Sequence, residues 1–323
     1  MINAVCTLAE DAHLEKGAGA LLNSLWRSGF RGDFHVGYRG TPPRWLGIAG
    51  EESTANPPGT PGIVVRLHRE ASGPHLTNRK ADFMRELFAD NPGMTGLIYL
   101  DPDIVCDLPW SYLADWAQCG ILLCEDLYSP LPTGHPRRCG WRRSLAEQGI
   151  TLAPRFGEYA NGGMVGLTRG HADFLRTWSE IQAVVSRLLG GDHLAAVGGP
   201  IRSHTGTLGL ANCWDLTDQD ALNAAVEARH DIPVSMQGRS MMGASHGFCF
   251  SGLPHAHGRP KPWKKRFIIR ALQGFGPGPA DRAYWKYAGA PLRIEGAARR
   301  LWVRFSIPAA AALGRFYRRG PGI

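Results

Sequence analysis

The sequence predicts an α/β fold with a mixed, mostly parallel central sheet. Its first 38 residues alternate between a strand over 2–8, a helix over 16–28 and a strand over 34–38. Such a β-α-β opening forms a right-handed parallel unit. Further along, the apolar β-prone run Leu97–Leu100 is typical of a buried strand in a parallel sheet. With 323 residues, 44% of them hydrophobic, the chain can bury a full core.

The other elements follow in order along the chain. We expect strands over 63–67, 120–124 and 164–168, helices over 80–89 and 171–189, and a helix that begins near Thr217 with Thr217 as its N-cap. The Pro- and Gly-rich stretch 40–62 is predicted to be an irregular insertion. Residues 127–158 are predicted to form a long loop that carries the basic cluster Arg137–Arg143, either as a solvated flap or as a substrate-binding segment.

The strand Leu97–Leu100 is followed at once by Asp101 and Asp103, separated by one residue. Open α/β sheets bind ligands at the carboxyl ends of their strands. Because adjacent carboxylates repel each other, a shared divalent cation such as Mn²⁺ or Mg²⁺ would explain the pair. The alternative is a polar loop in which Pro102 simply ends the strand.

A second group of polar side chains lies in the Gly- and Pro-rich segment 255–263. One of its histidines, His255 or His257, is a candidate third metal ligand beside the two aspartates, and Lys261 is a candidate phosphate ligand. The seven cysteines are scattered and contain no Cys-x-x-Cys pair, which favours reduced thiols in the cytoplasm over a disulfide framework or a zinc site.

Four segments together resemble the retaining glycosyltransferases of family 8, the group of glycogenin and the bacterial lipooligosaccharide galactosyltransferases. They are Tyr99-Leu100-Asp101-Pro102-Asp103, Asn161-Gly162-Gly163, Asp218-Gln219-Asp220-Ala221-Leu222-Asn223, and the His255-x-x-Gly258-x-x-Lys261-Pro262-Trp263 pattern. The resemblance implies a single GT-A domain, a Rossmann-like nucleotide-diphospho-sugar transferase, over residues 1–263. Residues 264–323 would then form a basic helical C-terminal appendage.

The resemblance also implies roles for individual residues. Asp101, Asp103 and His255 would hold Mn²⁺, or Mg²⁺ in its place, against the diphosphate of a UDP-sugar. The residues that would contact the rest of the donor are Thr7, Leu8, Ala9, Asp11 and Pro102 near the nucleoside, Gly258 and Lys261 at the phosphates, and Lys80, which resembles a basic residue that reaches the donor.

Catalysis is assigned by the same resemblance to Gln219, Asp218 and Asn161. An amide is a poor nucleophile, so front-side attack is favoured, with Gln219 and Asp218 stabilising the positive charge on the sugar. The predicted activity is retaining transfer of a hexose, galactose or glucose, to a glycan or glycolipid acceptor in cell-surface or lipopolysaccharide synthesis.

Three alternative functions remain open. A nucleotidyltransferase on a related fold would be expected to have a Gly-rich basic loop after the first strand, where this chain has Glu10-Asp11-Ala12-His13. A degenerate relative would bind a nucleotide without turnover. A nucleic-acid-binding protein would use the basic C-terminal tail, but it leaves the aspartates unexplained, so no nucleic-acid partner is expected.

The C-terminal tail differs in charge from the rest of the chain. From Arg259 onward it carries fifteen lysines and arginines against Asp281 and Glu295. Aromatic residues and arginines are mixed over Arg299–Phe305, a composition that suits a membrane interface. No secretory signal and no apolar run long enough to span a bilayer is evident. We therefore expect a cytoplasmic protein bound peripherally to the anionic inner face of the membrane, the alternative being a solvated helical appendage.

Overall fold

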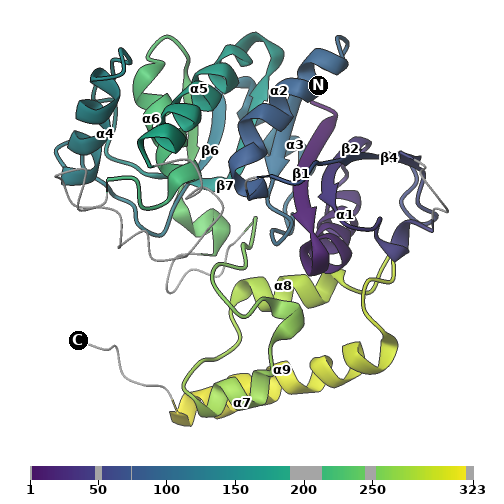
Figure 1. The fold of residues 1–323 in the computed structure, drawn as a ribbon. Coiled ribbons are helices and arrows are strands. Elements are labelled where there is room, and N and C mark those ends of the chain that lie inside the picture. Colours follow the sequence, from purple (N-terminus) through teal and green to yellow (C-terminus); the bar gives the residue numbers. More distant parts are fainter. Residues whose placement is uncertain (1, 48–52, 74, 190–212, 244–251, 318–323) are drawn as a thin grey trace. The chain divides into compact units, whose positions relative to one another are not determined.

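The computed structural model describes residues 2–47, 53–73, 75–189, 213–243 and 252–317. Its strands form an eight-stranded mixed sheet in the order β3-β4-β2-β1-β5-β7-β6-β8, so the predicted α/β fold is confirmed (Figure 1). The strands are β1 (Ala4–Glu10), β2 (Gly32–Arg39), β3 (Thr54–Ala55), β4 (Ile63–Arg69), β5 (Gly96–Leu100), β6 (Ile121–Glu125), β7 (Ala160–Thr168) and β8 (Val234–Gln237).

The helices lie between and after these strands. They include a π-helix (His13–Ala18), α1 (Gly19–Arg27), α2 (Lys80–Asp90), α3 (Trp110–Gln118), α4 (Pro136–Ala146), α5 (Asp173–Leu188), α6 (Thr217–Ala228), α7 (Phe267–Leu272), α8 (Pro279–Tyr287) and α9 (Ala297–Tyr317). Among the described residues, none of the helices is both long enough and apolar enough to cross a membrane.

The order in which strands are added to the sheet reverses between β1 and β5. These two strands pair in parallel, with Val5 opposite Ile98, whereas β5 and β6 each pair antiparallel with β7. The earlier strands β2 and β4 lie on one side of β1, and the later strands lie on the other side, beyond β5. Such a reversal of strand order is the usual ligand-binding position of open α/β sheets, and Asp101 immediately follows β5.

The chain divides into two compact units that interleave along the sequence. The first unit comprises Met1–Leu8, Arg69–Leu100 and Ser111–Arg239. Its hydrophobic core joins alternate residues of β1, β5, β6 and β7 to the apolar faces of α2, α4, α5 and α6, with Trp141 and Trp178 fully buried. Helices α5 and α6 lie side by side in this unit (Figure 1).

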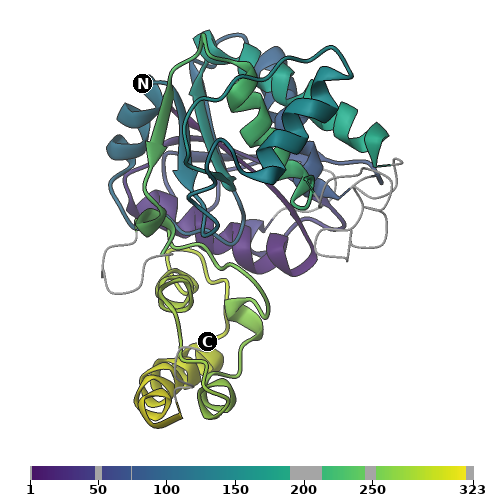
Figure 2. The same ribbon diagram turned by 90° about the vertical axis from the view of Figure 1, so that its left-hand side faces the viewer.

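The second unit comprises Ala9–His68, Asp101–Trp110 and Ser240–Ile323. Within it α7 runs alongside α9 (Figures 1 and 2). Phe267, Ala271, Val303 and Ala310 form the shared core of these two helices. The buried Asn23 side chain of α1 donates to the carbonyls of Tyr287 and Leu292 at 2.7 and 2.8 Å. The described part of the C-terminal segment thus packs within a unit that also includes α1, and a domain boundary after residue 263 stays a prediction.

Several predicted elements are corrected. The segment 127–158 is not an uninterrupted loop, because it contains α4. The helix expected over 16–28 begins earlier, as the π-helix. Thr217 is not the N-cap of α6 but its first residue; Leu216 is the N-cap, and its N–H donates to Asp220 at 2.8 Å. Strand β7 begins at Ala160, so Asn161, Gly162 and Gly163 lie inside a strand rather than before it.

Candidate functional site

The structure brings the two aspartates and His255 together through backbone pairing. After β5 ends at Leu100, the N–H of Ile104 donates to the Asp101 carbonyl at 3.0 Å and closes a turn. Ile104 then forms an antiparallel bridge with His255, and the Ala256 N–H donates to the Asp103 carbonyl at 3.1 Å. The segment that carries the imidazole is therefore fixed beside the turn that carries both carboxylates.

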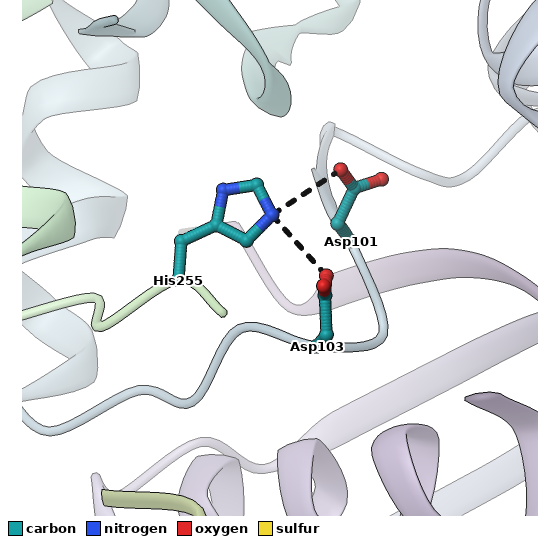
Figure 3. Close-up of side chains that lie close together, drawn as sticks. All are labelled: Asp101, Asp103 and His255. Atoms are coloured by element: carbon teal, nitrogen blue, oxygen red, sulfur yellow. Dashed lines mark ion pairs between the residues drawn. The ribbon is translucent and has the colours of Figure 1, made fainter. Parts of the chain in front are cut away.

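The three side chains converge on one point (Figure 3). His255 Nε2 lies 3.2 Å from Asp103 Oδ1 and 3.8 Å from Asp101 Oδ2, and one ligand atom from each residue lies within 4.8 Å of the others. The side chains are 6–20% exposed, so the carboxylates are largely desolvated. Two hard oxygens and an imidazole are a donor set that suits Mn²⁺, and the residues therefore fit the predicted ion.

Lys261 pairs with the Asp103 carboxylate oxygen that His255 does not contact. Its ammonium group donates to Asp103 Oδ2 and, at 2.8 Å, to the carbonyl of Ala256. Burial raises the pKa of Asp103, but the charges and hydrogen bonds of His255 and Lys261 outweigh it and hold this pKa well below its usual range. Asp103 is thus ionised throughout the physiological range, as a metal ligand must be.

Backbone conformation explains the predicted glycine near this cluster. Gly258 has φ +70°, a left-handed conformation in which a side chain would be strained. Asp11 also has a positive φ, 49°, and is exposed. Pro102 is buried, and a Cβ atom at Gly17 would collide with the carbonyl oxygen of Pro102. The π-helix therefore lies close to the turn that carries Asp101 and Asp103.

His13 is a residue near this cluster that the sequence did not single out. It lies in the π-helix, a rare element that is frequent at functional sites, and its ring meets Trp263 edge-on at 5.2 Å between centroids. Burial lowers its pKa, and the Asp103 and Asp101 charges oppose that shift. No local pattern marks one histidine after a strand, so only its position in the fold identifies it.

In the first unit, Lys80 and Asp218 form a buried polar pair. Lys80 begins α2, and its Nζ donates to the carbonyl of Gly162 at 2.8 Å and to Asp218 Oδ2 at 3.3 Å. The Lys80 side chain is 2% exposed and that of Asp218 is 15% exposed. A Cβ at Gly162 would lie 3.1 Å from Asp218 Oδ2, which explains a glycine at this position of β7.

Gln219 and Asn161 are held by the same strand and helix. Gln219 Oε1 accepts from the Gly162 N–H at 2.9 Å, and Asn161 Oδ1 accepts from the Gly163 N–H at 2.7 Å. The Asn161 amide donates to Asp126, a residue that the sequence did not single out. Asn223 exchanges hydrogen bonds with the N–H and carbonyl of Ala160, which ties α6 to β7. The motif Asp218–Asn223 therefore has a clear structural role beside its predicted catalytic one.

Asp220 is paired with Arg137 of α4. Arg137 Nη2 donates to both carboxylate oxygens at 2.7 and 2.8 Å, and the Tyr159 hydroxyl donates to Asp220 Oδ1 at 2.7 Å. Asp220 is fully buried, and burial raises its pKa to about 6 despite the Arg137 charge. This carboxylate is fixed inside the protein.

Two further arginines of the basic cluster also form ion pairs within the first unit. Arg138 and Arg142 each pair with the buried Glu227 at 2.8 Å. Neither prediction for this cluster, a solvated flap or a substrate-binding segment, describes Arg137, Arg138 and Arg142, because buried carboxylates hold all three. Trp141 and Leu145, at i and i+4, are one local signal of this helix, and Pro136 at its first position is another.

The predicted nucleoside-contacting residues of β1 are buried. Thr7 is fully buried, and its hydroxyl has no hydrogen-bond partner among the residues that the structure describes. Leu8 and Ala9 are 4% and 2% exposed, and Leu8 belongs to the core of the first unit. Their proposed contacts with uracil and ribose stay predictions.

Comparisons with known proteins add little beyond the fold. No protein-family model and no curated protein matches the chain. Among solved structures, it is similar to the glycosyltransferase GlyE of Streptococcus pneumoniae TIGR4, with 12% identity and a TM-score of 0.47. The match covers 95% of this chain and 64% of the GlyE chain, so this chain spans less than two thirds of the length of GlyE. Similarity at this level does not transfer an activity.

Proposed function

We propose that this chain is a retaining glycosyltransferase that moves a hexose, galactose or glucose, from a UDP-sugar to a glycan or glycolipid acceptor. The observation that carries the proposal is the cluster of Asp101, Asp103 and His255, in which Lys261 pairs with Asp103. The two aspartates come directly after β5. Two carboxylates, an imidazole and a lysine are the groups that a metal-bound diphosphate requires.

The chemistry follows from the charge that develops during transfer. When the glycosidic bond of the donor breaks, the leaving nucleoside diphosphate gains negative charge. A bound Mn²⁺ ion would act as a Lewis acid on that diphosphate. Asp101, Asp103 and His255 would hold the ion, and Lys261 would donate to a phosphate oxygen. Groups fixed in advance stabilise the developing charge more than they stabilise the bound donor, which accelerates the reaction.

The proposal assigns the sugar side of the reaction to Asp218, Gln219 and Asn161. Gln219 and Asn161 are buried and hydrogen-bonded to β7, so their positions are fixed before any substrate binds. The Asp218 carboxylate is held by Lys80. A carboxylate and an amide oxygen next to the reacting carbon would stabilise its positive charge and favour attack from the same face as departure.

Donor hydrolysis tests this function directly. The protein should release UDP from UDP-galactose or UDP-glucose in the presence of Mn²⁺, and Asp103→Asn should lose that release. A matched control is Asp33→Asn, because Asp33 lies in the same unit and pairs with Arg66 at 2.8 Å. A nucleotidyltransferase would instead release pyrophosphate from a nucleoside triphosphate, and that result would replace the proposal.

A second part of the proposal concerns the membrane. Helix α9 packs through Val303, Ser306 and Ala310, whereas Leu301, Phe305 and Phe316 on the opposite side are 57%, 65% and 84% exposed. Spacings of four and eleven residues place these three side chains on one face. Exposed Arg304 and Arg315 lie on the same helix.

An apolar helical face flanked by arginines suits an anionic lipid surface. We therefore propose peripheral binding to the inner face of the membrane, where a lipid-linked acceptor of cell-surface or lipopolysaccharide synthesis would be presented.

A further inference from the structure

Helix α8 contacts the segment that carries Asp101 and Asp103. Lys286 Nζ donates to Asp107 Oδ1 at 2.6 Å, and the Tyr287 hydroxyl donates to the same oxygen. Asp107 lies four residues after Asp103, and its N–H donates to the carbonyl of Gly252 at 2.8 Å. Helix α8 is therefore hydrogen-bonded to Asp107, in the chain that continues from the turn of Asp101 and Asp103.

The same helix contacts the segment that carries His255 and Lys261. Asp281, in the first turn of α8, is buried and pairs with Lys265 at 2.7 Å. The Tyr284 ring packs on the Trp263 ring at 5.2 Å between centroids. Arg299, near the start of α9, donates to the carbonyl of Trp263. The contacted residues, Trp263 and Lys265, lie two and four positions after Lys261 in the sequence.

Helix α8 is itself held in place by the first helix of the chain. The carbonyl of Tyr287 accepts from Asn23, and Leu292, just beyond α8, exchanges two hydrogen bonds with the same amide. Glu295 accepts from the Tyr284 hydroxyl at 3.1 Å and pairs with Lys16 at 3.3 Å. The helix therefore has a fixed support from which it can position both ligand segments.

We propose that α8 is a clamp that holds the two backbone-paired segments bearing the metal ligands in their relative positions, with Asp107 and Tyr287 as positioning residues. The proposal rests on the metal centre of the proposed function. The C-terminal segment would then be a part of the metal site, and not an appendage that can be removed without affecting it.

The energetics separate this role from a general contribution to stability. Asp107 and Lys286 are 32% and 52% exposed, and an ion pair this accessible contributes little to folding. Groups that orient metal ligands from outside the coordination shell nevertheless change metal affinity by about 10- to 100-fold. A clamp therefore predicts loss of metal affinity with little loss of stability.

The test measures Mn²⁺ affinity of the full chain by electron paramagnetic resonance of the free ion, together with the thermal unfolding midpoint. Asp107→Ala should weaken Mn²⁺ binding about tenfold or more. Asp107→Asn should recover most of that affinity, because its amide oxygen still accepts from Tyr287. Tyr287→Phe removes one hydroxyl and should weaken binding severalfold.

The matched control is Asp33→Ala, which removes a carboxylate of similar exposure, 35%, from an ion pair in the same unit. It should leave Mn²⁺ affinity unchanged. Wild-type affinity in both folded variants, Asp107→Ala and Tyr287→Phe, would overturn the clamp and leave the proposed function standing. Absence of Mn²⁺ binding by the wild-type protein would overturn the metal centre and the clamp with it.

Discussion

Lys261 donates from one ammonium group to the carboxylate of Asp103 and to the carbonyl of Ala256. It thus neutralises the Asp103 oxygen that faces away from His255. A lysine in this position would compete with a metal ion for Asp103. It would also donate a hydrogen bond to a diphosphate held by that ion. The two effects have opposite signs, and they can be measured separately.

Lys261→Met should therefore separate metal binding from nucleotide binding. Mn²⁺ alone should bind more tightly, because a competing cation is removed from Asp103. UDP in the presence of Mn²⁺ should bind about 10- to 100-fold more weakly, because a charge-assisted hydrogen bond to phosphate contributes roughly 1.5–3 kcal/mol. Isothermal titration gives both constants, with the exposed Lys264→Met as control. Unchanged UDP affinity would remove Lys261 from the phosphate site.

Gln219→Ala should slow turnover about a hundredfold while leaving the dissociation constant of UDP within about twofold of the wild-type value. The reason is that Gln219 is proposed to act on the sugar and not on the nucleotide. The measurement is the steady-state rate of UDP release beside UDP titration. Gln182→Ala, which removes another buried glutamine of the first unit, is the control. Wild-type turnover in Gln219→Ala would reject the catalytic role.

The buried Asp220 predicts a specific dependence of stability on pH. Its pKa in the folded chain is about 6, above the ordinary value of 3.8. Well below pH 3.8 Asp220 is protonated in both the folded and the unfolded chain; as pH rises from there to 6 the unfolded chain ionises first, so unfolding becomes easier. Relative to Asp220→Asn, the wild-type free energy of unfolding should fall by about 2–3 kcal/mol between pH 4 and 7. Urea denaturation measures this difference, and a difference independent of pH would contradict it.

Membrane binding through α9 predicts a selective effect of its exposed aromatic residues. Replacing Trp302 and Phe305 with serine should weaken sedimentation with anionic phosphatidylglycerol vesicles about tenfold or more, because each side chain loses apolar burial in the lipid interface. Tyr128→Ser is the control, since Tyr128 is as exposed as Phe305, at 65%, but lies in the first unit. If the double variant still sediments like the wild type, α9 does not bind the membrane.

The sequence predicted those parts of the site that depend on short stretches of chain. An apolar run followed by two carboxylates indicated both the strand β5 and the turn after it, and the spacing from His255 to Lys261 indicated a second polar segment. Their convergence follows from the backbone pairing of the two segments, which includes the bridge between Ile104 and His255.

The parts that the sequence did not predict depend on contacts between distant residues. Asp220 accepts a hydrogen bond from Arg137, 83 positions away, and Asp107 accepts one from Tyr287, 180 positions away. Helix α4 was missed because four arginines obscure its apolar face, and its partners on α6 are known only from the fold. Local patterns cannot indicate which buried carboxylate an arginine will meet.

The central claim is that Asp101, Asp103 and His255 bind Mn²⁺ and through it a UDP-sugar. The most direct measurement is thermal unfolding with UDP, UDP-galactose, UDP-glucose and GDP-mannose, each with Mn²⁺ or with EDTA, for wild type, His255→Ala and His257→Ala. A ligand at about a hundredfold its dissociation constant adds roughly 2.7 kcal/mol of stability. We predict stabilisation by the uridine nucleotides that requires Mn²⁺, persists in His257→Ala and is lost in His255→Ala. Equal stabilisation in EDTA, or none from any nucleotide, would contradict the claim.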